Sequence, residues 1–313
     1  MKIALKIDVD TYRGTVEGVP RLVELLQKYQ ARATFLFSLG PDHTGRAIKR
    51  VFRPGFFSKV SRTSVVEHYG IKTLLYGTLL PGPDIGRGCA DVLRGVAQAG
   101  FETGIHTWDH IKWQDGVGTD VKYASNDWTE RQMRAACDRY AEIFGTAAHT
   151  HGAAGWQMNR HAMRLTQTLG FYYCSDTRGT HPFLPMVRGE IIRCPQIPST
   201  LPTLDELIGL NGVTPDNVHE HVLAVSREAA STYGHVYTLH AELEGMKLLP
   251  VFERLLAGWR ERGDELVATR DIAATLDRAA LPHHSIAWSE VPGRSGVMAL
   301  QGPAFLAAAV PAA

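Results

Sequence analysis

The sequence predicts an α/β fold, namely a distorted barrel built from about seven βα units. Two observations lead to this prediction. Strand-like and helix-like patterns alternate along residues 1–280. The strand-like runs, such as the one at 33–38, are bulky and apolar at successive positions, which is typical of parallel strands covered on both faces. This number of units in a chain of 313 residues suits a closed barrel better than an open sheet.

The strand-like runs are short, and most of the helix-like patterns end at a glycine. The predicted strands cover residues 3–7, 33–38, 101–105, 171–174, 235–239 and 265–269. The predicted helices cover residues 19–29, 91–99, 129–144, 162–169, 217–233, 248–262 and 271–280. Thr129 and Gln132 match a capping box, so we expect the third of these helices to begin at that point.

Two stretches depart from the βα rhythm. Residues 43–83 interrupt it with a basic and apolar segment, which we predict to be a helical insertion in a single barrel domain spanning residues 1–280. The pattern fades from residue 281. We therefore expect residues 281–313 to be a partly disordered C-terminal extension, with a frayed Ala/Pro-rich tail at 301–313.

Composition excludes several classes of protein. The chain is 44% hydrophobic and 21% charged, as an ordinary globular protein is, and its net charge of +1 gives no reason to expect a nucleic-acid partner. The four cysteines are widely spaced and form no CxxC pair, which argues against a zinc ribbon or a disulfide framework. The first residues show no signal-peptide pattern and no run of about 18 apolar residues occurs, so we expect a cytoplasmic protein.

His106 and His110 are the strongest candidates for metal ligands. We expect the two imidazoles, four positions apart, to lie on one face of a helical turn and converge on one ion. Asp10 follows an apolar strand and would supply a carboxylate, leaving coordination positions open for water and substrate. This donor set suits zinc, while manganese, cobalt, iron and nickel also fit an open site.

Four further residues near predicted strand ends are candidates for catalytic or supporting roles. Asp8 should face the same way as Asp10, because residues two apart in a strand share a face, and it would be free to act as a base. The alternative is a turn aspartate that caps backbone amides. His240 ends a strand and could be a general acid or a satisfied buried histidine. Asp176 could orient His240, and Arg178 could pair with a carboxylate.

The order of these motifs resembles the polysaccharide deacetylase family over about residues 1–280. The resemblance rests on Asp8-Val-Asp10, Arg32-Ala-Thr-Phe35, Gly100-Phe-Glu-Thr-Gly-Ile-His-Thr-Trp-Asp-His110 and Leu239-His240. It implies a metal-dependent amidohydrolase on a distorted (β/α)7-type barrel. It also implies that Asp8 is the catalytic base, that His240 is the catalytic acid supported by Asp176, and that the ligands are Asp10, His106 and His110.

Within the family, the chain is most similar to a branch that removes formyl from 4-deoxy-4-formamido-L-arabinose linked to undecaprenyl phosphate. The segments Ser175-Asp-Thr-Arg-Gly179 and Thr238-Leu-His-Ala-Glu-Leu-Glu-Gly245 are among those that support this. The third family motif usually carries an arginine that holds the base. Here that region reads Gly152-Ala-Ala-Gly-Trp156, and Arg178 is our candidate replacement. The rival functions are a deacetylase acting on another N-acetylated sugar or on peptidoglycan, and a noncatalytic glycolipid-binding barrel.

The insertion at 43–83 is predicted to contact lipid at the cytoplasmic face of the inner membrane. Basic side chains alternate there with aromatic ones, which is a pattern that can lie in a membrane interface and attract anionic lipid. The alternative is a solvated helical hairpin packed on the barrel. The residues expected to make the contact are Arg46, Lys49, Arg50, Phe52, Arg53, Phe56, Phe57, Lys59 and Arg62.

Overall fold

The computed structural model describes residues 1–47, 70–117, 124–228, 232–294 and 296–305. Its centre is a seven-stranded sheet in which all pairings are parallel, with strand order β5-β4-β3-β2-β1-β8 and with β9 also paired to β1. The strands are β1 (Lys2–Val9), β2 (Thr34–Ser38), β3 (Glu102–Thr107), β4 (Thr150–His151), β5 (Tyr173–Cys174), β8 (His235–His240) and β9 (Glu265–Val267). The predicted α/β class and parallel sheet are confirmed, and β4 is a strand that the sequence analysis did not predict.

An irregular extended segment closes the gap between β5 and β8. Ile197 donates its N–H to the carbonyl of Cys174 in β5, and Thr200 donates to the carbonyl of Val236 in β8. Between them, Ser199 donates its N–H to Thr177 just past the end of β5. The wall is therefore a distorted barrel in which one position is held by single bridges rather than by a regular strand.

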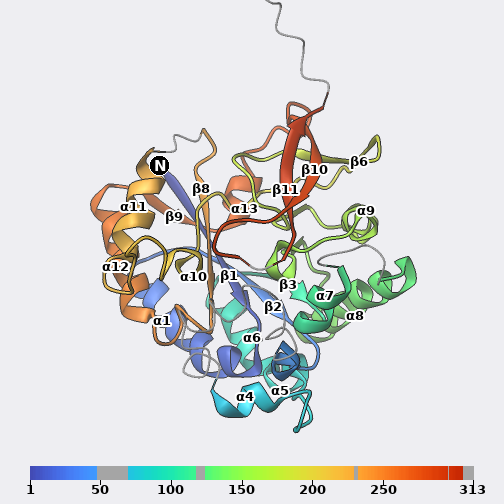
Figure 1. Ribbon diagram of the computed structural model, residues 1–313, viewed down its shortest axis with the longest axis horizontal. Coiled ribbons are helices and arrows are strands. Elements are labelled where there is room, and N and C mark those ends of the chain that lie inside the picture. The colour runs from blue at the N-terminus through green and yellow to red at the C-terminus, as the bar shows by residue number, and fades with distance from the viewer. Residues whose placement is uncertain (48–69, 118–123, 229–231, 295, 306–313) are drawn as a thin grey trace, which may run out of the picture.

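Helices surround this sheet on the outside, as Figure 1 shows. Helix α6 contacts α1 and α8, α8 contacts α9, and α11 contacts α12. The helices are η1 (Gly14–Gly18), α1 (Val19–Lys28), α4 (Ile71–Leu75), α5 (Ile85–Gly88), α6 (Ala90–Gln98), α7 (His110–Val117), α8 (Asn126–Phe144), η3 (Ala154–Trp156), α9 (Arg160–Thr168), α10 (Leu204–Leu207), α11 (Val218–Glu228), α12 (Leu249–Glu261) and α13 (Thr269–Ala273). No helix in the described ranges is long and apolar enough to cross a membrane.

The start predicted for α8 is wrong. The helix begins at Asn126, and its cap is Ser125, whose hydroxyl accepts a hydrogen bond from the backbone N–H of Trp128. Thr129 lies one turn inside the helix and is fully buried, with its hydroxyl bonded to the carbonyl of Ser125. The Ser125 cap satisfies an otherwise free amide of the first turn, which makes it the better start.

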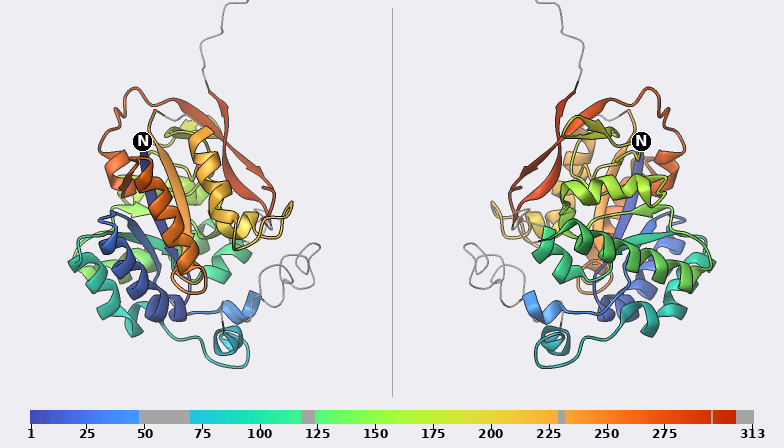
Figure 2. Two further views of the ribbon diagram at one scale, coloured as in Figure 1. Left: turned by 90° about the vertical axis from the view of Figure 1, so that its left-hand side faces the viewer. Right: turned by 90° about the vertical axis from the view of Figure 1, so that its right-hand side faces the viewer.

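A second sheet stands beside the barrel, with strand order β11-β10-β6-β7. Its strands are β6 (Leu184–Val187), β7 (Glu190–Ile191), β10 (His283–Ser289) and β11 (Met298–Ala304). In the three views of Figures 1 and 2, the β10–β11 hairpin and α4 lie toward opposite ends of the molecule. The expectation of a frayed tail from residue 301 is wrong for residues 301–304, which belong to β11. Residues 306–313 lie outside the described residues.

Alternation along β1 sets up the interior of the barrel. Ile3, Ile7 and their odd-numbered neighbours pack in the core under the helices. Ala4 instead packs with Val236 and Val267, inside the barrel near the N-terminal ends of the strands. Because side chains two apart share a face of a strand, Lys6 lies above Ala4, and Asp8 lies at the C-terminal mouth.

Candidate functional site

Five polar side chains meet at the C-terminal ends of β1, β3 and β8. Asp8 is the last residue but one of β1, and Asp10 is the first residue after the strand. His106 lies near the end of β3, and His110 begins α7. His240 is the last residue of β8 and is the Cα partner of Asp8 in the β1–β8 pairing. The mouth of the parallel strands is where enzymes of this architecture carry their chemistry.

Asp10, His106 and His110 form a cluster that can hold a metal ion. One potential ligand atom from each lies within 4.8 Å of the other two. The two carboxylate oxygens of Asp10 divide between the histidines, with Oδ1 3.2 Å from Nε2 of His106 and Oδ2 3.4 Å from Nε2 of His110. The convergence that the sequence predicted is therefore present.

The local geometry of the histidine pair differs from the prediction. His106 belongs to strand β3 and His110 opens helix α7, so they do not share one helical turn. The chain reverses over Trp108 and Asp109, and the two rings stack with centroids 5.4 Å apart. A strand-to-helix turn brings them together because both flank the same strand end.

The hydrogen bonding of His106 leaves Nε2, the ring nitrogen that faces the cluster, available to bind a metal. Its Nδ1 lies 2.7 Å from the carbonyl oxygen of Gly152, which can only accept, so Nδ1 carries the proton. Nε2 is then a free lone pair that faces Asp10. A carbonyl on the far nitrogen is the usual way in which proteins orient a metal-binding histidine.

The charges of the cluster reinforce one another. Burial raises the pKa of Asp10 most strongly, but the nearby His110, His106 and His240 outweigh it, so the pKa of Asp10 lies well below its ordinary value. Burial lowers the pKa of His106, whereas Asp8 and Asp10 raise it, and the net shift is upward. An ionised Asp10 among histidines is a prepared place for a cation.

Asp8 is held by a residue that the sequence analysis missed. Lys6 Nζ donates to Oδ2 of Asp8 over 3.1 Å, and both side chains are almost completely buried. The other oxygen, Oδ1, is buried without a hydrogen-bond partner and lies 3.7 Å from Nδ1 of His106. The prediction that Arg178 takes this role is wrong. Its guanidinium bonds Glu206 and the carbonyl of Leu201 instead.

Two buried glutamates hold the backbone on either side of the site, and both were missed. Glu242 Oε1 accepts from the N–H groups of Asp10 and Thr11 and from the Thr11 hydroxyl, at 2.8 to 3.0 Å. Glu244 accepts from the N–H of His240 and from the hydroxyl of Tyr237. The signal in the sequence was the presence of two glutamates within five residues of His240. Buried carboxylates need hydrogen-bond donors around them, so such glutamates are expected to hold nearby groups.

Asp176 does not support His240 as predicted. Its Oδ1 accepts from Nδ1 of His151 at 2.6 Å and from the N–H of Ala153, and its Oδ2 accepts from the amide of Gln196. These contacts tie β4, β5 and the closing segment together inside the barrel. The backbone support of His240 comes from Glu244 instead.

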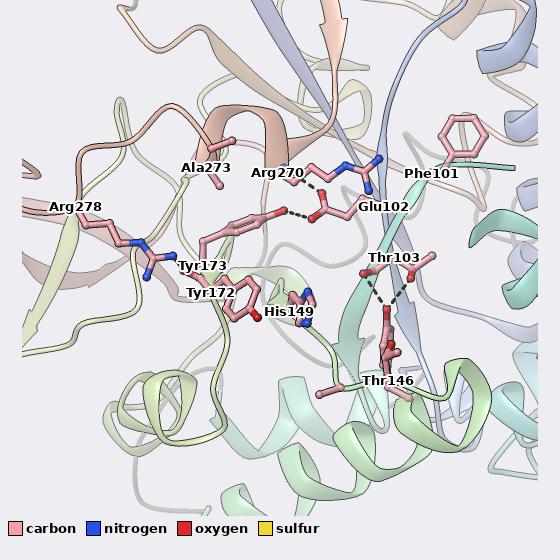
Figure 3. Close-up of a pocket in the computed structure, with 13 residues that line it drawn as sticks. Phe101, Glu102, Thr103, Thr146, His149, Tyr172, Tyr173, Arg270, Ala273 and Arg278 are labelled. Atoms are coloured by element: carbon pink, nitrogen blue, oxygen red, sulfur yellow. Dashed lines mark hydrogen bonds between the residues drawn. The ribbon is translucent and has the colours of Figure 1, made fainter. Parts of the chain in front are cut away.

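A pocket lined by thirteen residues lies at the other end of the barrel (Figure 3). It has a volume of about 450 Å³ and includes Glu102, Tyr173 and Arg270 in its wall. Glu102 accepts hydrogen bonds from the Tyr173 hydroxyl and the Arg270 N–H, so its carboxylate is already satisfied. This is the N-terminal end of the strands, where polar clusters stabilise the barrel.

The predicted lipid-contact residues fall mostly outside the described residues. The exception is Arg46, which is half-buried and donates from Nε to the carbonyl of Gly77 at 2.9 Å. The nearby turn after α4 carries two exposed leucines, Leu79 at 81% and Leu80 at 38% exposure.

Comparison with known proteins agrees with this geometry. The model of the family described as polysaccharide deacetylase matches residues 2–174. A Shewanella sediminis protein named "Probable 4-deoxy-4-formamido-L-arabinose-phosphoundecaprenol deformylase ArnD" is 35% identical, and the match covers 96% of this chain and 94% of that one. A protein of the same name from Wigglesworthia glossinidia brevipalpis is 32% identical, with 92% and 98% covered.

The fold comparison points the same way. A solved structure from Mycobacterium smegmatis, assigned as a polysaccharide deacetylase, superposes with a TM-score of 0.61 at 16% identity, covering 93% of this chain and 95% of that chain. At this identity the likeness concerns the fold alone. The family match over more than half of the sequence and the two nearly full-length relatives establish more: the chain belongs to the polysaccharide deacetylase family.

Proposed function

We propose that this protein hydrolyses the formamide of undecaprenyl-phosphate-linked 4-deoxy-4-formamido-L-arabinose and releases formate and the 4-amino sugar lipid. The observation that carries the proposal is the meeting of Asp10, His106 and His110 at the barrel mouth, with Asp8 and His240 on paired strands beside them. The choice of substrate rests on the two relatives, which are named as deformylases of this glycolipid. The reaction class is hydrolysis of a linear amide C–N bond.

The residues at the mouth fit a divalent ion. Asp10 Oδ1 is buried and lacks a hydrogen-bond partner, and Nε2 of His106 is a free lone pair facing it. His110 adds a second imidazole nitrogen on the other carboxylate oxygen. A bound ion would lower the pKa of a water molecule and stabilise negative charge on the formamide oxygen. Two nitrogens and one carboxylate suit zinc, and manganese, cobalt, iron and nickel remain candidates.

Asp8 is the proposed general base. Its free Oδ1 is buried on the His106 side, so a proton taken from an attacking water has an acceptor next to the cluster. The pairing with Lys6 fixes the orientation of the carboxylate. Proton transfer to a positioned carboxylate contributes roughly 10²- to 10⁴-fold to such reactions.

His240 is the proposed general acid. It faces Asp8 across the β1–β8 pairing, and its half-buried side chain has an Nδ1 without a hydrogen-bond partner. Amide hydrolysis needs a proton on the departing nitrogen, because an amide anion is a very poor leaving group. His240 would deliver that proton as the C–N bond breaks. The product is a sugar amine, which becomes cationic at neutral pH.

The positive charge of the product amine would have a biological consequence at the outer surface of the cell. Transferred to lipid A, the aminoarabinose reduces the negative charge of the outer surface. Cationic peptides such as polymyxin then bind less strongly. The names of the two relatives support only the glycolipid substrate of this proposal, and the pathway role follows from the family resemblance and the positive charge of the product.

We infer peripheral contact with the cytoplasmic face of the inner membrane, because the proposed substrate is anchored there by its lipid. Leu79 and Leu80 support this inference, since exposed leucines on a turn can enter the interface. Exposed Lys72 on α4 adds a positive charge nearby. Sedimentation with anionic vesicles tests the inference, and a Leu79→Ser/Leu80→Ser variant that still binds like the unmodified protein would contradict it.

The decisive test is formate release from the formamido-arabinose glycolipid, beside its acetamido analogue, with and without chelator. Formyl and acetyl differ by one methyl, which is worth only about 1–3 kcal/mol of discrimination in a pocket. We expect chelator-sensitive formate release that exceeds acetate release. Faster turnover of the acetamide would favour a deacetylase, and binding of the glycolipid without turnover would favour a noncatalytic barrel.

A further inference from the structure

Lys6 is a charged side chain in the interior of the barrel. It lies in the middle of β1 and its exposed fraction is 0%. Burial of an ammonium is costly unless the charge is paired and hydrogen-bonded. Its hydrogen-bond partner is Oδ2 of Asp8, at 3.1 Å. A buried lysine therefore stands directly beneath the proposed base.

The surroundings of Lys6 are shaped to admit its long side chain. A Cβ built on Gly152 would lie 2.9 Å from Cε of Lys6 and 2.4 Å from a methyl carbon of Leu36, so this position has no room for a side chain. The ring of Trp156 lies on another side, with its centroid 5.1 Å from Nζ. Gly152 also supplies the carbonyl that orients His106. Lys6 is thus packed against the same segment that fixes a proposed metal ligand.

The two aspartates beside the histidines have different supports. Asp10 is fixed through its backbone N–H by Glu242, and its two carboxylate oxygens point at the two histidines. Asp8 is fixed through its carboxylate, since Lys6 takes Oδ2 and leaves Oδ1 on the His106 side. The carboxylate of Asp10 can therefore bind a metal, whereas Asp8, held by Lys6 through Oδ2, keeps Oδ1 to accept a proton.

We propose that Lys6 is the positioning residue of the reaction: its ammonium holds Oδ2 of Asp8 so that Oδ1 is aimed at the reacting water. The proposal rests on the function proposed above, in which Asp8 is the base. Lys6 hydrogen-bonds Asp8 and none of Asp10, His106 and His110, so in this proposal it acts through the base. A purely structural role would predict a different outcome, because loss of a buried charge partner would disturb the whole mouth, metal binding included.

Lys6→Met tests the proposal, because methionine keeps most of the length and removes the charge. Lys28→Met is the matched control, since Lys28 is exposed on α1 and pairs with Glu253. We expect Lys6→Met to bind one metal per chain with an unchanged cobalt absorption spectrum and a KM within about threefold of the unmodified enzyme. Its kcat should fall by roughly 10²-fold, at the low end of the contribution of a positioned base. Lys28→Met should keep its kcat.

A double-mutant cycle with Asp8→Asn identifies the partner. If Lys6 acts through Asp8, the further loss caused by Lys6→Met in the Asp8→Asn enzyme should be less than about threefold. Multiplicative losses would overturn the proposal. So would a Lys6→Met enzyme with unimpaired kcat, or one that loses its metal or changes its cobalt spectrum. Lys6→Gln carries the same criteria if the methionine variant does not fold. An unmodified enzyme that releases no formate would refute the proposed function instead.

Discussion

Glu244 should make the stability of this protein fall as the pH rises toward 8. Burial is the main cause that raises the pKa of its carboxyl from 4.5 to about 8, although the N–H of His240 lowers it. The folded protein therefore keeps a proton on Glu244 over a pH range in which the unfolded chain has lost it. The folded state binds more protons there, so the free energy of unfolding decreases with increasing pH.

The size of the effect follows from the difference between the two pKa values. Each pKa unit corresponds to about 1.4 kcal/mol, so the difference between 4.5 and about 8 corresponds to at most about 5 kcal/mol. That contribution is complete below pH 4.5 and is lost by pH 8. For 313 residues, an unfolding entropy of about 2 cal/mol/K per residue converts it to roughly 7 °C in Tm.

Glu244→Gln isolates this contribution. A glutamine has the shape of the neutral acid, and it can accept from the N–H of His240 while its amide donates to the hydroxyl of Tyr237. Melting curves at pH 5, 6, 7 and 8 should show the variant gaining on the unmodified protein as the pH rises, by several degrees in total. Glu24→Gln, at an exposed position on α1, is the control. A Tm difference that stays constant within about 1 °C over this range would refute a neutral Glu244.

Three further predictions concern the mouth of the barrel. Chelator should abolish formate release, and added zinc, manganese or cobalt should restore it; activity that survives complete metal removal, checked by elemental analysis, would contradict the metal site. His106→Ala should lose the metal, whereas His240→Ala should keep it and lose about 10²-fold or more in kcat; an active His240→Ala enzyme would remove the acid assignment. Glu242→Gln should keep near-normal metal affinity, because burial and Asp10 raise the pKa of Glu242 well above its ordinary value, so that glutamine mimics its neutral form. Glu242→Ala should weaken metal binding measurably by titration, because it leaves the N–H groups of Asp10 and Thr11 without their acceptor.

The sequence predicted the positions of residues correctly where those positions depend on a single strand. The run that became β2 is apolar at its three central positions, those of β1 and β3 place apolar residues among polar ones, and all three strands are buried along almost their whole length, as strands of a covered parallel sheet are. Polar residues directly after such runs must lie at the C-terminal edge, which is why the strand pattern alone places Asp10 and His106 near each other. The family resemblance added His240 on the adjacent strand, and the β1–β8 register agrees with it.

Partner choice inside the barrel could not be predicted in the same way. Asp176 and Arg178 lie two and four residues after the end of the short strand β5, and nothing in the local sequence tells which neighbour they reach. The closing segment brings Gln196 to Asp176, while Glu206 from α10 takes Arg178. These contacts depend on an irregular connection between β5 and β8. Side-chain periodicity carries no information about such a connection.

The β10–β11 hairpin was missed for a related reason. The residues of β10 are mostly half-buried, and its sequence His-His-Ser-Ile-Ala-Trp-Ser has only three apolar residues, so its apolar signal is weak. The strand is stabilised by pairing with β6, about 100 positions earlier in the sequence. The loop of this hairpin also brings Arg294 to Glu206 and over the ring of Trp156, which couples the C-terminal sheet to the interior of the barrel.

The position of Lys6 shows how strictly this site depends on strand parity. Ala4, Lys6 and Asp8 face the barrel interior only because β1 has no bulge between them and keeps one register with β8 over six residue pairs. A one-residue slip of β1 would turn the lysine and the aspartate toward the helices, among Leu22 and Leu26, and would point isoleucines at the histidines. An alanine inserted between Leu5 and Lys6 should therefore either prevent folding or give a folded protein with a strongly reduced kcat. A folded insertion variant with normal kcat and KM would show that the Lys6–Asp8 arrangement is not tied to the strand, and so would contradict the geometry on which the assignment of the base depends.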